Sequence, residues 1–167
     1  VDYGKVIGNG EASIQNSATG YKGNNYGGQS STYTTISRKM VEKTGSAEDN
    51  NQNVKWTIKI NPDRVENISG EYTLTDLLND SALDISDISK VTDFNIIETD
   101  FMNSWKETTV TDTAYKNGRL TVRSGCFYTI TYKTPVNYVG GDNSASYTNS
   151  ITIKDGDKEY TDTGSVT

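Results

Sequence analysis

The sequence contains no histidine and only one cysteine, Cys126. A single cysteine cannot form an internal disulfide. The missing histidine removes the commonest general base and the commonest metal ligand. Catalysis by a serine–histidine or cysteine–histidine pair is therefore excluded, and we expect no zinc site, no other metal and no cofactor.

Long apolar runs and clusters of positive charge are also missing. No run of about 18 apolar residues occurs, so we expect no membrane-spanning helix. The net charge is −6, and no basic stripe is interleaved with aromatic residues. This balance argues against nucleic acid and against an anionic membrane surface as partners.

The residues that are abundant favour β-structure. Threonine, serine, tyrosine and asparagine dominate, with fifteen glycines and eleven tyrosines. Segments such as 54–61 alternate cleanly, with Trp56, Ile58 and Ile60 on one face, and turn signals such as Asn117-Gly118 separate them. Roughly nine to eleven short strands and no convincing helix predict an all-β, immunoglobulin-like β-sandwich, with a closed barrel as the alternative.

The chain divides by composition near residue 34. Residues 1–33 are rich in glycine and polar residues, which predicts an N-terminal extension, a linker or edge strands, with a loop over 21–31. The sandwich is expected to span 34–167. Candidate ligand surfaces are the loops 19–32 and 79–92 and the tyrosines Tyr21, Tyr26 and Tyr138.

Two expected strands carry a polar residue on their apolar face. In "SYTNSITI" Asn149 alternates with one tyrosine and two isoleucines, and in "EYTLTDLL" Asp76 alternates with one tyrosine and two leucines. A buried amide or carboxyl group costs free energy unless it is hydrogen-bonded, paired or used chemically. The structural interpretation is that Asp76 starts a turn and that Asn149 bonds to backbone.

The chemical interpretation adds a lysine to the amide and the acid. An uncharged amine can attack an asparagine amide and release ammonia, while a protonated acid hydrogen-bonds the carbonyl oxygen. Burial lowers the pKa of a lysine and raises the pKa of a carboxyl group, so it favours both reactive forms. The product is an isopeptide bond, made without histidine or metal.

Five segments, taken in chain order, carry a resemblance to a known family: "VEKTG", "KWTIKIN", "YTLTDLL", "YTITYKTPV" and "YTNSITI". Between residues 36 and 155 the chain resembles the A-type domains of collagen-adhesin-like surface proteins and pili of Gram-positive bacteria. Those domains are Ig-like and contain an intramolecular lysine–asparagine isopeptide bond. The resemblance implies Lys43 as nucleophile, Asp76 as catalytic acid and Asn149 as acceptor. Lys39, which has the same parity as Lys43, stays open as the alternative nucleophile.

The resemblance also implies a role and a location. It implies a stalk or adhesin module, extracellular and anchored to the cell wall of a Gram-positive bacterium. The implied partners are neighbouring domains of the same surface protein, and host extracellular-matrix protein or glycan. The cross-link forms once per chain, so we expect no enzyme in the usual sense.

Two other functions fit the composition. One is a ligand-binding adhesin head, which sequence does not separate from a stalk. The other is a carbohydrate-binding β-sandwich of a secreted enzyme, which predicts a planar aromatic platform and no cross-link. Cys126 is expected to be a small buried hydrophobe, and "KDGDKE" is expected to be a hairpin turn, since a calcium loop needs more oxygen ligands.

Overall fold

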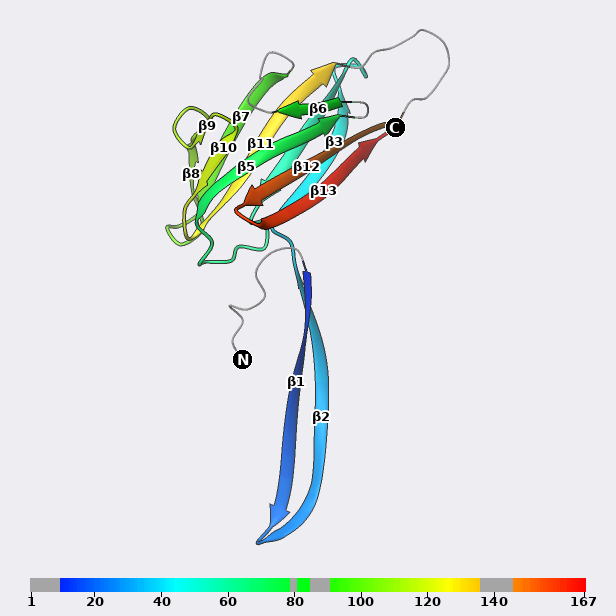
Figure 1. The fold of residues 1–167 in the computed structure, drawn as a ribbon, viewed down its shortest axis with the longest axis vertical. Coiled ribbons are helices and arrows are strands. Elements are labelled where there is room, and N and C mark those ends of the chain that lie inside the picture. The colour runs from blue at the N-terminus through cyan, green and yellow to red at the C-terminus, as the bar shows by residue number, and fades with distance from the viewer. Residues whose placement is uncertain (1–9, 79–80, 85–90, 136–145) are drawn as a thin grey trace. The chain divides into compact units, whose positions relative to one another are not determined.

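The computed structural model describes residues 10–78, 81–84, 91–135 and 146–167 (Figure 1). The chain divides into two compact units, Val1–Arg38 and Lys39–Thr167. In the described residues, no helix is long and apolar enough to cross a membrane. The loop 79–92 and Tyr138, two of the candidate ligand surfaces, lie largely or wholly outside the described residues.

The first unit is a two-stranded hairpin. β1 (Gly10–Lys22) and β2 (Asn25–Arg38) pair antiparallel along their whole length. Gly23, with φ of 62°, lies in the turn between them. The predicted loop over 21–31 is therefore wrong, because the ladder runs through most of it. Serine, threonine and glycine show no apolar alternation here, so a pattern-based prediction has no signal to detect.

One sheet of the second unit has five antiparallel strands (Figure 1). Its central pairing sets aromatic and aliphatic residues opposite each other, with Tyr132 opposite Trp56 and Ile130 opposite Ile58. In spatial order the strands are β3 (Val41–Glu48), β4 (Asn53–Ile60), β11 (Cys126–Pro135), β7 (Thr92–Asp100) and β8 (Lys106–Thr109).

The other sheet has six strands. The predicted Asn117-Gly118 turn joins Tyr115–Lys116 to Arg119–Val122, the two strands at one edge of this sheet. Its φ angles of 52° and 74° are those that a two-residue hairpin turn requires. In spatial order the strands are β13 (Lys158–Val166), β12 (Tyr147–Asp155), β5 (Gly70–Leu78), β10 (Arg119–Val122) and β9 (Tyr115–Lys116), and β6 (Ser81–Asp84) pairs with β5.

The core lies between these sheets. Alternating residues of β4 and β11 point into it, as their sequence pattern predicts. Trp56, Tyr128 and Tyr132 are the largest fully buried side chains, so aromatic residues fill much of a core that is poor in aliphatic ones. The all-β sandwich predicted from the sequence is confirmed.

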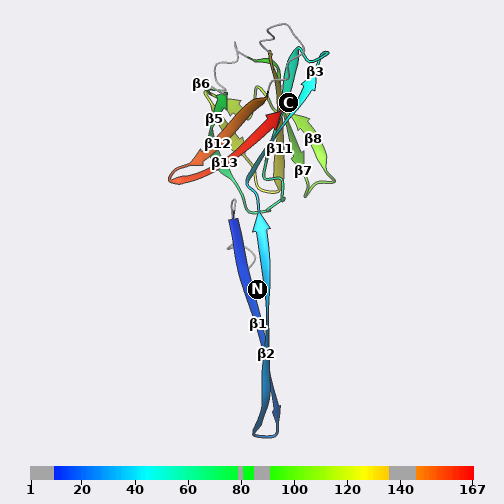
Figure 2. The ribbon, with the colours of Figure 1, turned by 90° about the vertical axis from the view of Figure 1, so that its right-hand side faces the viewer.

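Two edge strands, β3 and β13, meet along one side of the sandwich (Figures 1 and 2). The backbone N–H of Lys43 donates to Oδ2 of Asp162 at 2.6 Å. A Cβ on Gly164 would lie 3.1 Å from the carbonyl oxygen of Lys43 and 3.2 Å from Cα of Thr44. Glycine at 164 therefore permits this close approach of the two backbones.

Candidate functional site

Lys43 points into the core from β3. Its side chain is fully buried, although lysine is almost never fully buried unless it has a partner. Nζ lies 2.8 Å from Oδ1 of Asp76 and donates a hydrogen bond to Oη of Tyr132 at 2.7 Å. The position follows from β-strand alternation, because Lys43 has the same parity as the buried Val41.

Asp76 and Asn149 face Lys43 from the opposite sheet. Asp76 lies on β5 and Asn149 on β12, and both residues are 0% exposed. The pairing of these two strands sets Asp76 opposite Ile151, and Asn149 lies two residues before Ile151 on β12. The structure therefore brings together the three residues that the sequence singled out, two from one sheet and one from the other.

The hydrogen bonding of this cluster is incomplete. Nδ2 of Asn149 donates to Oη of Tyr132 at 3.3 Å. Oδ1 of Asn149 and Oδ2 of Asp76 are both buried, and neither accepts a hydrogen bond. Buried polar atoms are normally satisfied, so two such oxygens in one cluster call for a chemical explanation.

Aromatic rings enclose the amine of Lys43. Nζ lies 5.4 Å from the ring centroid of Trp56 and 5.3 Å from that of Tyr132. The indole N–H of Trp56 donates to Oγ1 of Thr134 at 2.9 Å, which fixes the orientation of the ring. A Cβ on Gly45 would lie 2.6 Å from an atom of the same ring, so β3 needs glycine there. These contacts exclude water from the amine.

Burial shifts the pKa values of both charged groups toward their neutral forms. It lowers the pKa of Lys43 from its usual 10.5 to about 8, against the opposing charge of Asp76. It also raises the pKa of the Asp76 carboxyl, which the lysine and the asparagine amide oppose. Burial thus moves both pKa values in the direction of a free amine and a carboxylic acid, the two forms that amide attack requires.

Lys39, the alternative nucleophile, lies outside the cluster. It precedes β3 and its side chain is exposed. Its backbone N–H donates to Oδ2 of Asp63 at 2.6 Å, which holds the chain just before the strand begins. Parity alone did not separate the two lysines, but the start of β3 at Val41 does.

Tyr132 is a site residue that the sequence analysis did not single out. Its hydroxyl accepts hydrogen bonds from both Lys43 and Asn149. Its parity on β11 predicted burial, and a buried tyrosine hydroxyl normally needs a polar partner. This need for a polar partner was the sequence signal that could have pointed to Tyr132 as a site residue.

A second polar cluster surrounds Glu98, which is buried, whereas its partner Arg123 is exposed. The carboxylate accepts two hydrogen bonds from the Arg123 guanidinium, at 2.7 and 3.2 Å, and one from the Tyr128 hydroxyl at 2.7 Å. Cys126 lies next to this network as a buried free thiol, as expected. Glu98 is fully partnered, so this cluster has the character of a structural network.

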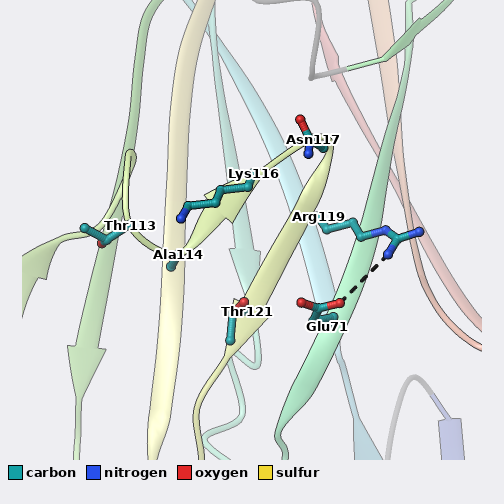
Figure 3. A pocket seen from close by; sticks show the side chains of 7 residues that line it. All are labelled: Glu71, Thr113, Ala114, Lys116, Asn117, Arg119 and Thr121. Atoms are coloured by element: carbon teal, nitrogen blue, oxygen red, sulfur yellow. Dashed lines mark ion pairs between the residues drawn. The ribbon is translucent and has the colours of Figure 1, made fainter.

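The outer surface offers a shallow depression beside the β9–β10 hairpin (Figure 3). Its volume is about 570 Å³ and its lining is mostly polar. Glu71 and Arg119 form an exposed ion pair across one side, at 3.9 Å. No group of three or more cysteine, aspartate or glutamate side chains in the described part of the chain is placed to hold a metal ion.

Two exposed tyrosines of the hairpin, Tyr21 and Tyr26, lie close together but do not form a flat surface. The rings of Tyr21 and Tyr26 lie 6.0 Å apart with an interplanar angle of 73°. A sugar-binding platform needs ring faces that a planar ligand can cover together. This pair presents an edge against a face.

No protein-family model and no curated protein matches this sequence. Among solved structures, the fold is similar to a structure described as "The Enterococcus faecalis MSCRAMM ACE binds its ligands by the collagen Hug Model". The TM-score is 0.52 with 13% identity, over 91% of this chain and 58% of that one. The chain thus spans less than two thirds of that protein's length.

A second solved structure is ACE19, described as the collagen-binding subdomain of the Enterococcus faecalis surface protein ACE. Its TM-score is 0.50 with 12% identity, and the similarity covers 78% of this chain and 98% of that one. At this level of identity the comparison concerns the fold. The immunoglobulin-like β-sandwich predicted from the sequence is confirmed.

Proposed function

We propose that this chain is a stalk or adhesin module of a Gram-positive cell-surface protein, stabilised by an isopeptide bond between Lys43 and Asn149. Asp76 serves as the catalytic acid. One observation carries the proposal: an amine, an acid and an amide are buried together, and one oxygen of the acid and one of the amide lack partners. A cluster selected only for stability would satisfy those oxygens.

The reaction uses the groups in sequence. The proton of Lys43 moves to the Asp76 carboxylate, 2.8 Å away, and leaves a free amine. Nζ attacks Cγ of Asn149, while the Asp76 carboxylic acid donates to Oδ1 and stabilises the charge that develops there. The Cγ–Nδ2 bond then breaks. Ammonia leaves with the two amide hydrogens and one hydrogen of the amine, and Asp76 ends as the carboxylic acid formed in the first proton transfer.

The rigid sandwich supplies the proximity that this reaction needs. Lys43 and Asn149 belong to opposite sheets, and both sheets are fixed by ladders and by a shared aromatic core. Holding reactants at contact can contribute about 7–11 kcal/mol to lowering a barrier. The bond would then fasten the two sheets to each other, which suits a protein exposed to proteases and mechanical load outside the cell.

Intact mass spectrometry of the purified chain tests the bond directly. We expect the mass to be lower than the sequence mass by one ammonia. Asn149→Ala and the isosteric Asp76→Asn should each abolish that loss, because one lacks the acceptor amide and the other the acid. Lys39→Ala is the matched control and should keep it. A well-folded wild-type chain at its full sequence mass would refute the proposal.

A ligand-binding head is the second candidate function, favoured by the fold similarity to a subdomain described as collagen-binding. The partner would be a host extracellular-matrix protein or glycan. Binding of the chain to immobilised triple-helical collagen, with heat-denatured collagen as control, tests this function. Saturable binding to the triple helix alone would support a head, and its absence would favour a stalk.

A further inference from the structure

The hydroxyl of Tyr132 lies between the two nitrogen atoms of the proposed reaction. It accepts hydrogen bonds from the attacking nitrogen, Nζ of Lys43, at 2.7 Å and from the departing nitrogen, Nδ2 of Asn149, at 3.3 Å. The ring is 1% exposed, so bulk water does not reach this position. The hydroxyl is thus placed to touch both reacting atoms.

Amide exchange requires a proton to move between these two nitrogens. The attacking amine must lose a proton to become an amide, and the departing nitrogen must gain one to leave as ammonia. Asp76 is committed to the carbonyl oxygen in the proposed reaction, where its proton stabilises the developing charge. Nδ2 donates a hydrogen bond to the Tyr132 hydroxyl, which also accepts one from Nζ.

We propose that Tyr132 is a catalytic residue that relays this proton, an inference that rests on the proposed function. In the tetrahedral intermediate, Nζ gives a proton to Oη while Oη gives its own proton to Nδ2. The Cγ–Nδ2 bond breaks, ammonia leaves and the tyrosine returns to its neutral form. A concerted exchange avoids a buried tyrosinate, whose charge would be costly to remove from water.

The fold holds the hydroxyl in this place. Tyr132 lies opposite Trp56 in the β4–β11 ladder, and Phe94 contacts its ring with a centroid distance of 6.3 Å. A packed ring with two flanking aromatics loses little further freedom on reaction. Placement within about 0.5 Å is what a proton relay requires.

Tyr132→Phe tests the relay, because it removes only the hydroxyl. The matched control is Tyr128→Phe on the same strand and the same face, where the hydroxyl bonds to Glu98 instead. Freshly synthesised chains from a cell-free system are quenched in acid over time, and ammonia loss is read by intact mass. We expect Tyr132→Phe to slow cross-linking by about a hundredfold or more, and Tyr128→Phe to leave the rate unchanged.

A second measurement separates proton transfer from simple packing. The wild-type rate should fall in heavy water, and Tyr132→Phe should lose this solvent isotope effect. If Tyr132→Phe does not fold, as judged by the fluorescence of buried Trp56, fluorotyrosine at position 132 replaces it. Fluorotyrosine keeps the shape and changes the acidity of the hydroxyl, so the rate should change.

The outcomes distinguish the two proposals. A wild-type chain that never loses ammonia refutes the isopeptide bond and the relay with it. A wild-type chain that loses ammonia, with a folded Tyr132→Phe variant that does so at the same rate, overturns the relay alone. An unchanged rate with fluorotyrosine has the same meaning.

Discussion

Asn149→Ala should have a larger effect on stability than a single buried amide explains. A bond from Lys43 to Asn149 closes a loop of about a hundred residues, and restricting such a loop in the unfolded chain is worth about 4–5 kcal/mol. In the cross-linked chain Nδ2 has left as ammonia, so its hydrogen bond to Tyr132 adds nothing to this loss. We therefore expect the free energy of unfolding to fall by about 4–5 kcal/mol.

Unfolding in guanidinium chloride, followed by tryptophan fluorescence, measures this loss. Trp56 is 1% exposed and passes into water on unfolding, so its emission reports the sandwich. A double-mutant cycle with Lys43→Ala isolates the tie. The bond can be lost only once, so the double variant should be more stable than additivity predicts, by about the 4–5 kcal/mol of the loop term.

Two results would refute this reasoning. A loss of only about 1 kcal/mol in Asn149→Ala would mean that a hydrogen bond, and no covalent tie, had been removed. A cycle in which Lys43→Ala and Asn149→Ala simply add would mean that the two residues contribute independently. Both results can be obtained from variants that fold normally.

Three further predictions concern other parts of the sandwich. Gly164→Ala should destabilise it by about 1–3 kcal/mol, measured by thermal unfolding, because the added Cβ meets the backbone of β3; an unchanged melting temperature would contradict this. The cross-linking rate should be bell-shaped in pH. In acid the rate falls because Lys43 and Asp76 both hold protons, and above about pH 8 it falls because the proton that they share is lost. A rate that keeps rising above about pH 8 would refute the role of Asp76 as the acid. Glu98→Ala should lower the free energy of unfolding in denaturant by about 2–3 kcal/mol and still lose ammonia. A Glu98→Ala variant at its full sequence mass would contradict the independence of the Glu98 and Lys43 clusters.

The sequence carried enough information to predict the sandwich and two of the cluster residues. Strand alternation places Asp76 and Asn149 on core faces without any knowledge of the fold, because the side-chain period of a strand is two. The choice between Lys43 and Lys39 depended on where β3 begins, and strand ends are set by tertiary contacts. Here the backbone of Lys39 is held by Asp63, a residue 24 positions away.

Other features depended on contacts between distant segments. Strand alternation explains the burial of Tyr132, but the hydrogen-bond partners of its hydroxyl come from β3 and β12, two distant parts of the chain. The hairpin of β1 and β2 was missed where serine, threonine and glycine replace any apolar pattern. Gly164 gave no local sign of its role, since the backbone it accommodates belongs to β3.

The meeting of β3 and β13 also bears on how the protein behaves at high concentration. An exposed edge strand is a template on which a second chain can add a strand, and such growth leads to aggregation. Here the carboxylate of Asp162 already occupies the N–H of Lys43, and the backbone beside Gly164 lies against the same strand. Each sheet thus shields an edge of the other, and this side of the sandwich offers a poor template for intermolecular strand pairing.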